Sequence, residues 1–209
     1  MYEDVHMAQA LIVFGNETAD EIVSAAEEVG GDQFDVIRKF VFHEKIGSDP
    51  EYLNFVRSHS NLSYIIGMTD VRLKPKVKAF ADESNMTPVS IVHPTAYVAP
   101  SATIGNGVFV APQAVISVNA NVEDHCIIHI HSSVGHDCKI GMFCVVLPGA
   151  RISGNVSLGK SVMIGSGAFI FQGVTLGYRS QVDALTYVRY DVPEKQMVSC
   201  RTRGGSNKT

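Results

Sequence analysis

The sequence lacks any apolar run approaching 18 residues, the length that a transmembrane helix requires. It also lacks the order of a signal peptide, because MYEDVHMAQALIVFG places acidic residues before its apolar stretch. Charged residues make up only 18% of the chain, with a net charge of −4, so it has no basic footprint for nucleic acid. These absences predict a cytoplasmic protein with no membrane span and no nucleic-acid partner.

Several common site motifs are also missing. None of the four cysteines forms a Cys-x-x-Cys pair, which disfavours a zinc site or a redox disulfide. The chain contains neither a Gly-x-Gly-x-x-Gly fingerprint nor a P-loop, so neither of the common phosphate-binding loops is present. Hydrophobic residues still make up 45% of the chain, enough for a sizeable core.

An aliphatic residue recurs at every sixth position from Val92 to Val188 without interruption. Four positions after each comes a second series, from Ala96 to Val192, in which no residue is larger than valine. Hexapeptide periodicity predicts a parallel β-helix, with three hexads forming one triangular coil of 18 residues. Residues 18 apart should therefore stack at about the inter-strand spacing of 4.8 Å. Three cysteines fill small inward slots and should serve as packing residues: Cys126, Cys138 and Cys144.

The first 91 residues alternate between strand and helix patterns, which predicts a small Rossmann-like parallel α/β domain. Strands are expected at 10–15, 34–42, 63–68 and 88–92, and helices at 18–29, 49–59 and 71–84. The predicted domains are 1–91 (α/β), 92–193 (β-helix) and 194–209 (a C-terminal segment with a flexible tail from Gly204).

Ligands of parallel α/β sheets bind beyond the carboxyl ends of the strands. Gly15 and Asn16 follow the first predicted strand, and Gly67 and Asp70 follow the third. The two glycines allow close approach to backbone, although each could equally be a simple turn. Asp70 either binds a ligand hydroxyl or caps the next helix, and capping is the favoured reading.

Four histidines lie close together in IIHIHSSVGHDC: His125, His129, His131 and His136. None occupies an aliphatic or small position of the repeat, so all four are expected to point outward. The stacking rule places Gly149 over His131 and Gly154 over His136. A glycine over an outward histidine leaves room for a slim ligand beside a free backbone N–H.

The carboxylate of Asp137, next to His136, can fix the imidazole tautomer and raise its basicity. His136 is therefore either a general base or an ordinary surface histidine. His131 and His136 are also five apart, as two zinc ligands are in the γ-class carbonic anhydrases, which share this repeat. The pair occupies different positions of the hexad here, so no metal is expected.

These residues together resemble the PglD/NeuD-type bacterial sugar acetyltransferases. The resemblance is carried by His93-Pro94-Thr95-Ala96, SSVGHDCKIG at 132–141, Gly149-Ala150 and SGNV at 153–156. It implies a left-handed β-helix, a homotrimer, and acetyl-CoA bound between neighbouring subunits. It implies that His136 is the general base, that Asp137 holds it, and that Gly154 offers its N–H to the acetyl carbonyl.

The resemblance further implies a coenzyme site that includes Gly149, Ala150 and Gly173 beside Gly154. The acceptor would be an amino sugar, typically UDP-linked, and acetyl transfer would be direct. Acceptor contacts are expected from six residues: Gly15, Asn16, Gly67, Asp70, His129 and His131.

The sequence departs from the family at three places. Of the family's glycine- and histidine-rich loop only Gly15 remains, and Ala19 stands at the histidine position. The segment His129-Ile130-His131 replaces an Asn-Thr pair, and 199–203 replaces the usual Gly-x-Pro-Ala-Lys close. The alternatives are therefore O-acetylation of sialic acid or another sugar, and a catalytically idle sugar-binding trimer.

Overall fold

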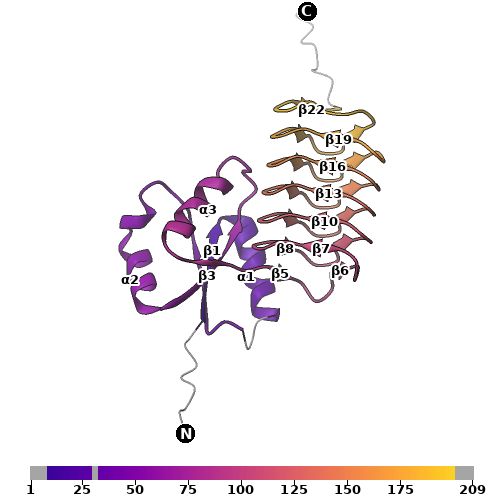
Figure 1. Cartoon of the computed structure of the whole chain (residues 1–209). Coiled ribbons are helices and arrows are strands. Elements are labelled where there is room, and N and C mark those ends of the chain that lie inside the picture. The colour runs from indigo at the N-terminus through magenta and orange to yellow at the C-terminus, as the bar shows by residue number, and fades with distance from the viewer. Residues whose placement is uncertain (1–8, 30–32, 201–209) are drawn as a thin grey trace, which may run out of the picture.

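The computed structural model describes residues 9–29 and 33–200, which form an α/β domain beside a β-helix (Figure 1). The tail predicted from Gly204 lies outside the described residues. The α/β elements are β1 (Gln9–Gly15), α1 (Glu17–Val29), β2 (Val36–Phe40), the 3₁₀ turn η1 (Ile46–Ser48), α2 (Pro50–Ser58), β3 (Asn61–Gly67), α3 (Lys74–Glu83) and β4 (Thr87–Pro88). The strands form a parallel sheet in the order β2-β1-β3-β4, which confirms the predicted class.

Local chemistry explains where two helices begin. The Asp49 carboxylate accepts hydrogen bonds from the N–H groups of Glu51 and Tyr52, so α2 begins at Pro50 as predicted. Helix α3 begins at Lys74 rather than at 71, because residues 71–73 form a turn. The Asp70 carboxylate accepts from the N–H of Arg72 in that turn, so the favoured reading of Asp70 as the cap of α3 is wrong.

The strand predicted at 88–92 is two strands. Strand β4 ends at Pro88 and extends the α/β sheet, whereas β5 (Ile91–Val92) begins the β-helix by pairing with β8 (Phe109–Val110). The Ser90 hydroxyl lies between them and donates to the carbonyl oxygen of Gly105 at 2.8 Å. The chain therefore passes from one sheet to the other within two residues.

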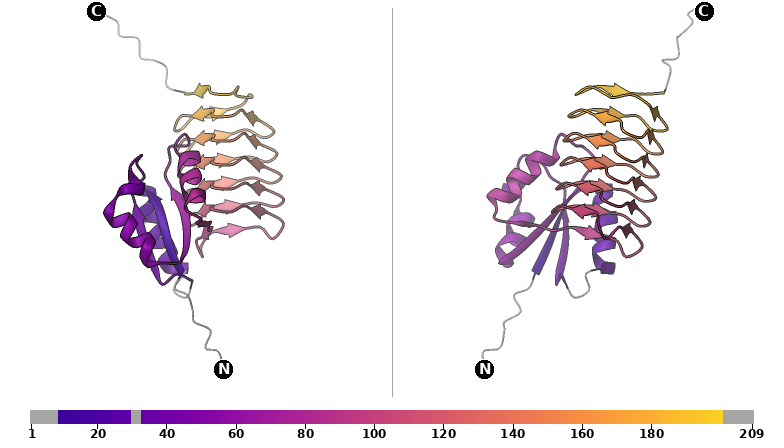
Figure 2. Two further views of the ribbon diagram at one scale, coloured as in Figure 1. Left: turned by 60° about the vertical axis from the view of Figure 1, so that its left-hand side comes forward. Right: turned by 45° about the vertical axis from the view of Figure 1, so that its right-hand side comes forward.

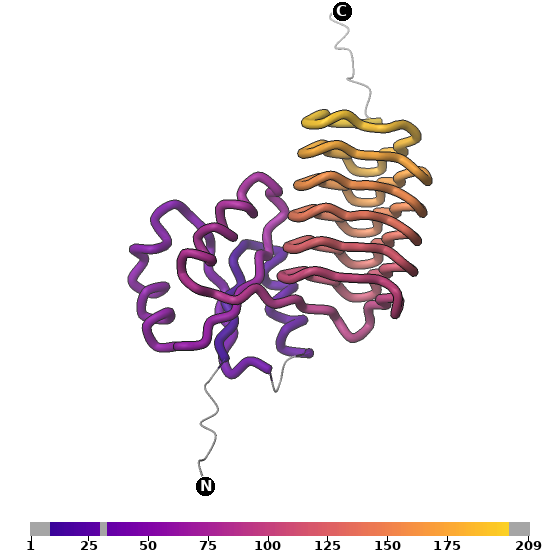
Figure 3. The backbone as a smooth tube through the Cα atoms, viewed as in Figure 1, coloured from indigo at the N-terminus to yellow at the C-terminus, as the bar shows by residue number. Residues whose placement is uncertain are grey.

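The backbone of the β-helix winds through a stack of coils (Figure 3). Its short parallel strands form three sheets, which are the three faces of the β-helix. Sheet I contains β5, β8, β11 (Ile127–Ile128), β14 (Val145–Val146), β17 (Met163–Ile164), β20 (Gln181–Val182) and β22 (Met197–Val198). Sheet II contains β6 (Tyr97–Val98), β9 (Val115–Ile116), β12 (Ser133–Val134), β15 (Arg151–Ile152), β18 (Phe169–Ile170) and β21 (Tyr187–Val188). Sheet III contains β7 (Thr103–Ile104), β10 (Asn121–Val122), β13 (Lys139–Ile140), β16 (Ser157–Leu158) and β19 (Thr175–Leu176).

Strand partners are 18 residues apart through most of the helix, as in Val110↔Ile128 and Ile128↔Val146, which confirms the stacking rule. The aliphatic and small series together form one continuous buried core, consistent with the predicted left-handed coil. Cys126, Cys138 and Cys144 are buried free thiols, and Cys138 donates to the carbonyl oxygen of Ser153 at 3.0 Å. Their predicted packing role is confirmed.

The register changes at the C-terminal end. Leu176 pairs with Val192 and Val182 with Val198, each 16 residues apart. The hexad after Val188 is therefore two residues short, and Val192 takes a strand position. Its assignment to the small series was wrong, because the shortened turn brings it level with Leu176.

The α/β domain covers sheet I of the first coils, and the later coils extend past it (Figure 2). Outward residues of sheet I pack beneath α1 and the sheet of the domain: Ile91, Phe109, Ile127 and Val145. Sheets II and III remain outside this contact. Because a triangular prism has three edges, the edge between sheets II and III lies opposite the α/β domain.

Candidate active site

His136 and Asp137 occupy the turn from β12 to β13, on the II–III edge. His136 Nδ1 lies 2.7 Å from Asp137 Oδ2. A carboxylate only accepts, so Nδ1 carries the proton and Nε2 keeps its lone pair. The hydrogen bond from His136, with a second from Asn119 Nδ2 at 3.1 Å, holds the pKa of Asp137 below its ordinary value.

The backbone conformation of Asp137 turns its carboxylate back toward His136, the preceding residue. Asp137 has a φ of 57°, in the left-handed region, which aspartate tolerates better than most residues. Its N–H donates to the carbonyl oxygen of Val118, one coil below. Left-handed residues recur at this position of the hexad, a rule that periodicity of the side chains alone did not show.

Gly154 lies directly over the free nitrogen of His136. A Cβ at Gly154 would stand 2.3 Å from His136 Nε2, so only glycine fits while the imidazole keeps this position. The Gly154 N–H donates no hydrogen bond within the described part of the chain. Gly173, on the same edge, has a φ of +76° and open space where a side chain would project. This edge therefore presents a base, a free donor and room for a ligand.

The other predicted coenzyme residues lie on a different edge. Gly149 and Ala150 follow β14 on the I–II edge, as His131 follows β11. His131 is exposed, and a Cβ at Gly149 would meet only the backbone nitrogen of Gly167, at 4.0 Å. Within one chain, sheet II separates these residues from His136.

The carboxyl ends of β1 and β3 form the cleft that the sequence predicted. Its volume is about 380 Å³, and Gly15, Asn16, Gly67 and Asp70 all line it. A Cβ at Gly15 would stand 1.9 Å from the Gly67 carbonyl oxygen, so the two strand ends meet only because Gly15 is glycine. Three apolar side chains that the sequence analysis missed complete the wall: Val41, Phe42 and Leu73. The end of the second predicted strand could have indicated two of them.

One departure from the family, Ala19, gains a physical reason, and Asp70 gains a partner. Ala19 is fully buried, and a Cβ at Gly67 would stand 2.8 Å from the Ala19 Cα. Helix α1 therefore packs closely on the end of β3, and the position contributes no side chain to the cleft. Asp70 is bound by Arg72 through Nε at 3.0 Å and Nη2 at 2.9 Å, which lowers the pKa of the Asp70 carboxyl.

Two of the four histidines are buried, although all four point outward from the coil as predicted. The His125 ring is stacked between Tyr64 and Phe143, with centroids at 5.7 and 5.3 Å. His129 is 3% exposed beneath α1. Both point out of the coil, but the α/β domain covers them. Burial lowers the pKa of each to about 4, and the Lys74 ammonium contributes.

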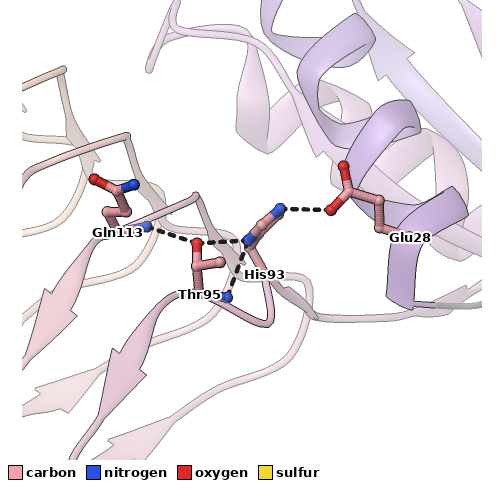
Figure 4. Close-up of polar contacts among 4 residues, drawn as sticks. All are labelled: Glu28, His93, Thr95 and Gln113. Carbon is pink, nitrogen blue, oxygen red and sulfur yellow. Dashed lines mark hydrogen bonds and ion pairs between the residues drawn. The ribbon is translucent and has the colours of Figure 1, made fainter.

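His93 connects the first coil to α1 (Figure 4). The Thr95 N–H donates to His93 Nδ1 at 3.1 Å, so Nε2 carries the proton and donates to Glu28 Oε2 at 2.9 Å. The Thr95 hydroxyl joins the same network, lying 2.9 Å from His93 Nδ1 and accepting from the Gln113 N–H at 3.2 Å. The family motif that begins with His93 thus fixes the α/β domain on the β-helix.

Residues 9–29 and 33–200 contain no group of three or more His, Cys, Asp or Glu side chains arranged to hold a metal ion. Within the same ranges, no helix is long and apolar enough to cross a membrane.

No family model matches the sequence. Among curated proteins, GDP-perosamine N-acetyltransferase of Escherichia coli O157:H7 is 32% identical over 109 residues, covering 52% of this chain. The match spans about half of that relative, 49% of its length.

Solved structures match nearly the whole chain. PerB from Caulobacter crescentus, in complex with CoA and GDP-perosamine, has a TM-score of 0.80 and 27% identity, covering 92% of this chain and 94% of that one. The acetyltransferase domain of PglB from Neisseria gonorrhoeae, in complex with acetyl coenzyme A, has a TM-score of 0.80 and 25% identity, covering 92% and 96%.

The chain is related to the bacterial sugar acetyltransferases of the hexapeptide-repeat type. The predicted resemblance and fold class are thereby confirmed. WeeI from Acinetobacter baumannii, at 20% identity, a TM-score of 0.81 and coverage of 92% and 97%, shares the fold.

Proposed function

We propose that this protein transfers an acetyl group from acetyl-CoA to an amino sugar. The observation that carries the proposal is the pairing on the II–III edge: a free His136 Nε2 beside the free N–H of Gly154. The similar structures support it, since that of the PglB domain contains acetyl coenzyme A and that of PerB contains CoA and GDP-perosamine. By analogy with GDP-perosamine, the acceptor is a nucleotide-linked amino sugar of surface-glycan synthesis, and the reaction is cytoplasmic.

The geometry fits direct transfer. The acceptor nitrogen attacks the thioester carbonyl and gives a proton to His136 Nε2 as the C–N bond forms. The Gly154 N–H hydrogen-bonds the developing oxyanion. The C–S bond then breaks, and the imidazolium returns its proton to the CoA thiolate. Asp137 acts through His136, by holding the Nδ1–H tautomer and stabilising the imidazolium.

A homotrimer completes the site. The outward positions of sheet II include four exposed apolar or aromatic residues, Tyr97, Val115, Phe169 and Tyr187, each 38–56% exposed. Ser133 and Arg151 lie between the two pairs, and the outward positions of sheet III are all polar. Packing sheet II around a threefold axis brings the II–III edge of one copy to the I–II edge of the next. Gly154 and Gly173 would then face Gly149 of the neighbour across a coenzyme groove. The Ala150 side chain is fully buried in the core of the coil, so only its backbone would take part. The acceptor cleft of one copy would open toward the His136 of another.

The test is acetyl-CoA binding followed by turnover. Saturation at 100 times the dissociation constant should stabilise the fold by roughly 2.7 kcal/mol, seen as a rise in melting temperature. His136→Ala should keep this shift, because the coenzyme contacts are backbone, and should lower kcat by about 10²–10⁴-fold with GDP-perosamine and UDP-linked 4-amino sugars. Absence of any shift would favour the idle sugar-binding trimer instead.

A further inference from the structure

A groove of about 450 Å³ runs between α1 and the I–II edge, outside the predicted acceptor cleft. We call it the α1 groove. Asp20, Glu21 and Glu28 line one wall, and His93, Pro112 and Ile130 line the other. Figure 4 shows the contact between Glu28 and His93, two of the residues that line it. Nothing in the sequence analysis assigned these carboxylates a role.

The three carboxylates differ in what neutralises them. Asp20 forms an ion pair with Lys39, and Glu28 accepts from His93. Glu21 has no lysine or arginine partner among the described residues, and its closest basic group is His129 Nδ1 at 3.3 Å. Burial raises the pKa of Glu21, as expected for a carboxylate without a bound cation.

His129 does not neutralise Glu21 at pH 7. Burial, with the nearby Lys74 ammonium, lowers the pKa of His129 to about 4, so its imidazole is uncharged. The ring is 3% exposed, and neither ring nitrogen has a hydrogen-bond partner within the described ranges. Buried polar atoms without partners require an explanation. Here the neutral ring lies 3.3 Å beneath the half-exposed Glu21 carboxylate and leaves its negative charge without a cation partner.

The groove lies at the level of the proposed base. Strands β11, β12 and β13 form one coil, so His129 and His136 share a level on opposite edges of sheet II. In the trimer proposed above, His136 of the next copy therefore approaches the end of the groove where Glu21 meets His129. Apolar atoms of Ala25, Pro112 and Ile130 line the same space and suit the methyl group of a deoxy sugar.

We propose that the α1 groove binds the ammonium group of the acceptor, with Glu21 as its ligand and His129 as the positioning residue beneath it. The enzyme then acetylates nitrogen rather than oxygen. This inference rests on the proposed function. The bound ammonium releases one proton to solvent through Glu21, and the amine gives its second proton to His136 Nε2 as the C–N bond replaces the C–S bond.

A matched pair of probes tests whether the charge of the ammonium group determines binding. GDP-linked 4-amino-4,6-dideoxymannose and GDP-linked 6-deoxymannose differ only in an amine or a hydroxyl at carbon 4. Calorimetry on the intact protein with CoA should show at least 10-fold tighter binding of the amine. Glu21→Gln should abolish that preference while leaving CoA affinity within twofold. Glu27→Gln, on the same helix but outside the groove, should retain it. Equal affinity for both sugars, or binding of neither, would overturn the proposal.

His129 needs a readout that a purely structural role would not move. His129→Asn should raise KM for the amine at least fivefold, with kcat within twofold and binding of the hydroxyl sugar unchanged. An equal loss for both sugars would show that His129 only supports the fold. If the amine binds selectively but no acetyl group is transferred, the groove is upheld and the proposed function fails.

Discussion

At the residue scale, one missing side chain shapes the proposed centre. Gly154 leaves the space that the imidazole of His136 occupies. The stacking rule predicted this pair from sequence because 18-residue spacing converts position directly into contact. The stacking rule did not predict the orientation of the His136 imidazole, since that orientation depends on the left-handed turn at Asp137.

Gly154→Ala tests this fit. The new Cβ, 2.3 Å from His136 Nε2, must push the imidazole away from its position and spoil its alignment with the acceptor. We expect kcat to fall at least 10-fold while the melting temperature changes little, because the His136 side chain that must move is half exposed. Gly47→Ala, in the 3₁₀ turn η1 of the α/β domain, where a Cβ meets only Phe80 Cε2 at 3.5 Å, is the matched control. Wild-type kcat in Gly154→Ala would contradict the arrangement.

Asp137→Asn tests the hydrogen bond to His136 Nδ1. An amide accepts more weakly than a carboxylate and can favour the other tautomer, so kcat should fall, but less than in His136→Ala. Steady-state kinetics of the two variants show which of them has the larger loss of kcat. A larger loss in Asp137→Asn would mean that the carboxylate touches the substrate itself.

At the element scale, the interface between the α/β domain and sheet I contains buried side chains whose burial the sequence could not show. The hexad positions of His125 and His129 predicted that both side chains point outward from the coil, and this prediction was correct. It carried no information on what lies outside the coil, because β3, α1 and α3 come from distant sequence. Lys74, fully buried at the start of α3, is a further example, with its ammonium unpaired in the described region. Burial also lowers the pKa of Lys74, to about 8.

The two buried histidines of this interface predict that the stability of the fold is sensitive to acid. The pKa of His125 and of His129 is about 4 when folded, against 6.5 in an unfolded chain, so the unfolded chain binds more protons between these values. Stability is therefore complete above pH 6.5 and is lost as the pH falls toward 4, by up to about 3 kcal/mol for each residue. His125→Phe keeps a ring between Tyr64 and Phe143 and removes the titration. Melting temperatures at pH 7.5 and pH 5 should differ less in this variant than in wild type.

The control for that comparison is His43→Gln, because His43 is exposed. It should keep the wild-type pH dependence. An identical slope in His125→Phe and wild type would show that acid acts elsewhere in the fold.

At the scale of the whole molecule, the proposed trimer depends on contacts of sheet II. Phe169→Lys should place a charge among the exposed apolar residues of sheet II and convert a trimer to monomers, with loss of acetyl transfer. Light scattering gives the mass, against 22.6 kDa for one chain. Thr175→Lys, at an outward polar position of sheet III, should leave the trimer intact. A wild-type monomer that still turns over would remove the need for any shared edge.

The shortened turn after Val188 has a consequence for the stack as a one-dimensional lattice. The strands of each coil pair with those of the next, and the last coil of a stack of identical 18-residue layers presents unpaired backbone groups to which another such layer could add. With Val192 and Val198 two residues out of step, the last layer presents spacings that another 18-residue layer cannot copy. We therefore expect this irregular last layer to disfavour the end-to-end joining of molecules into a fibre, because its strands do not match the spacing of another molecule's first coil.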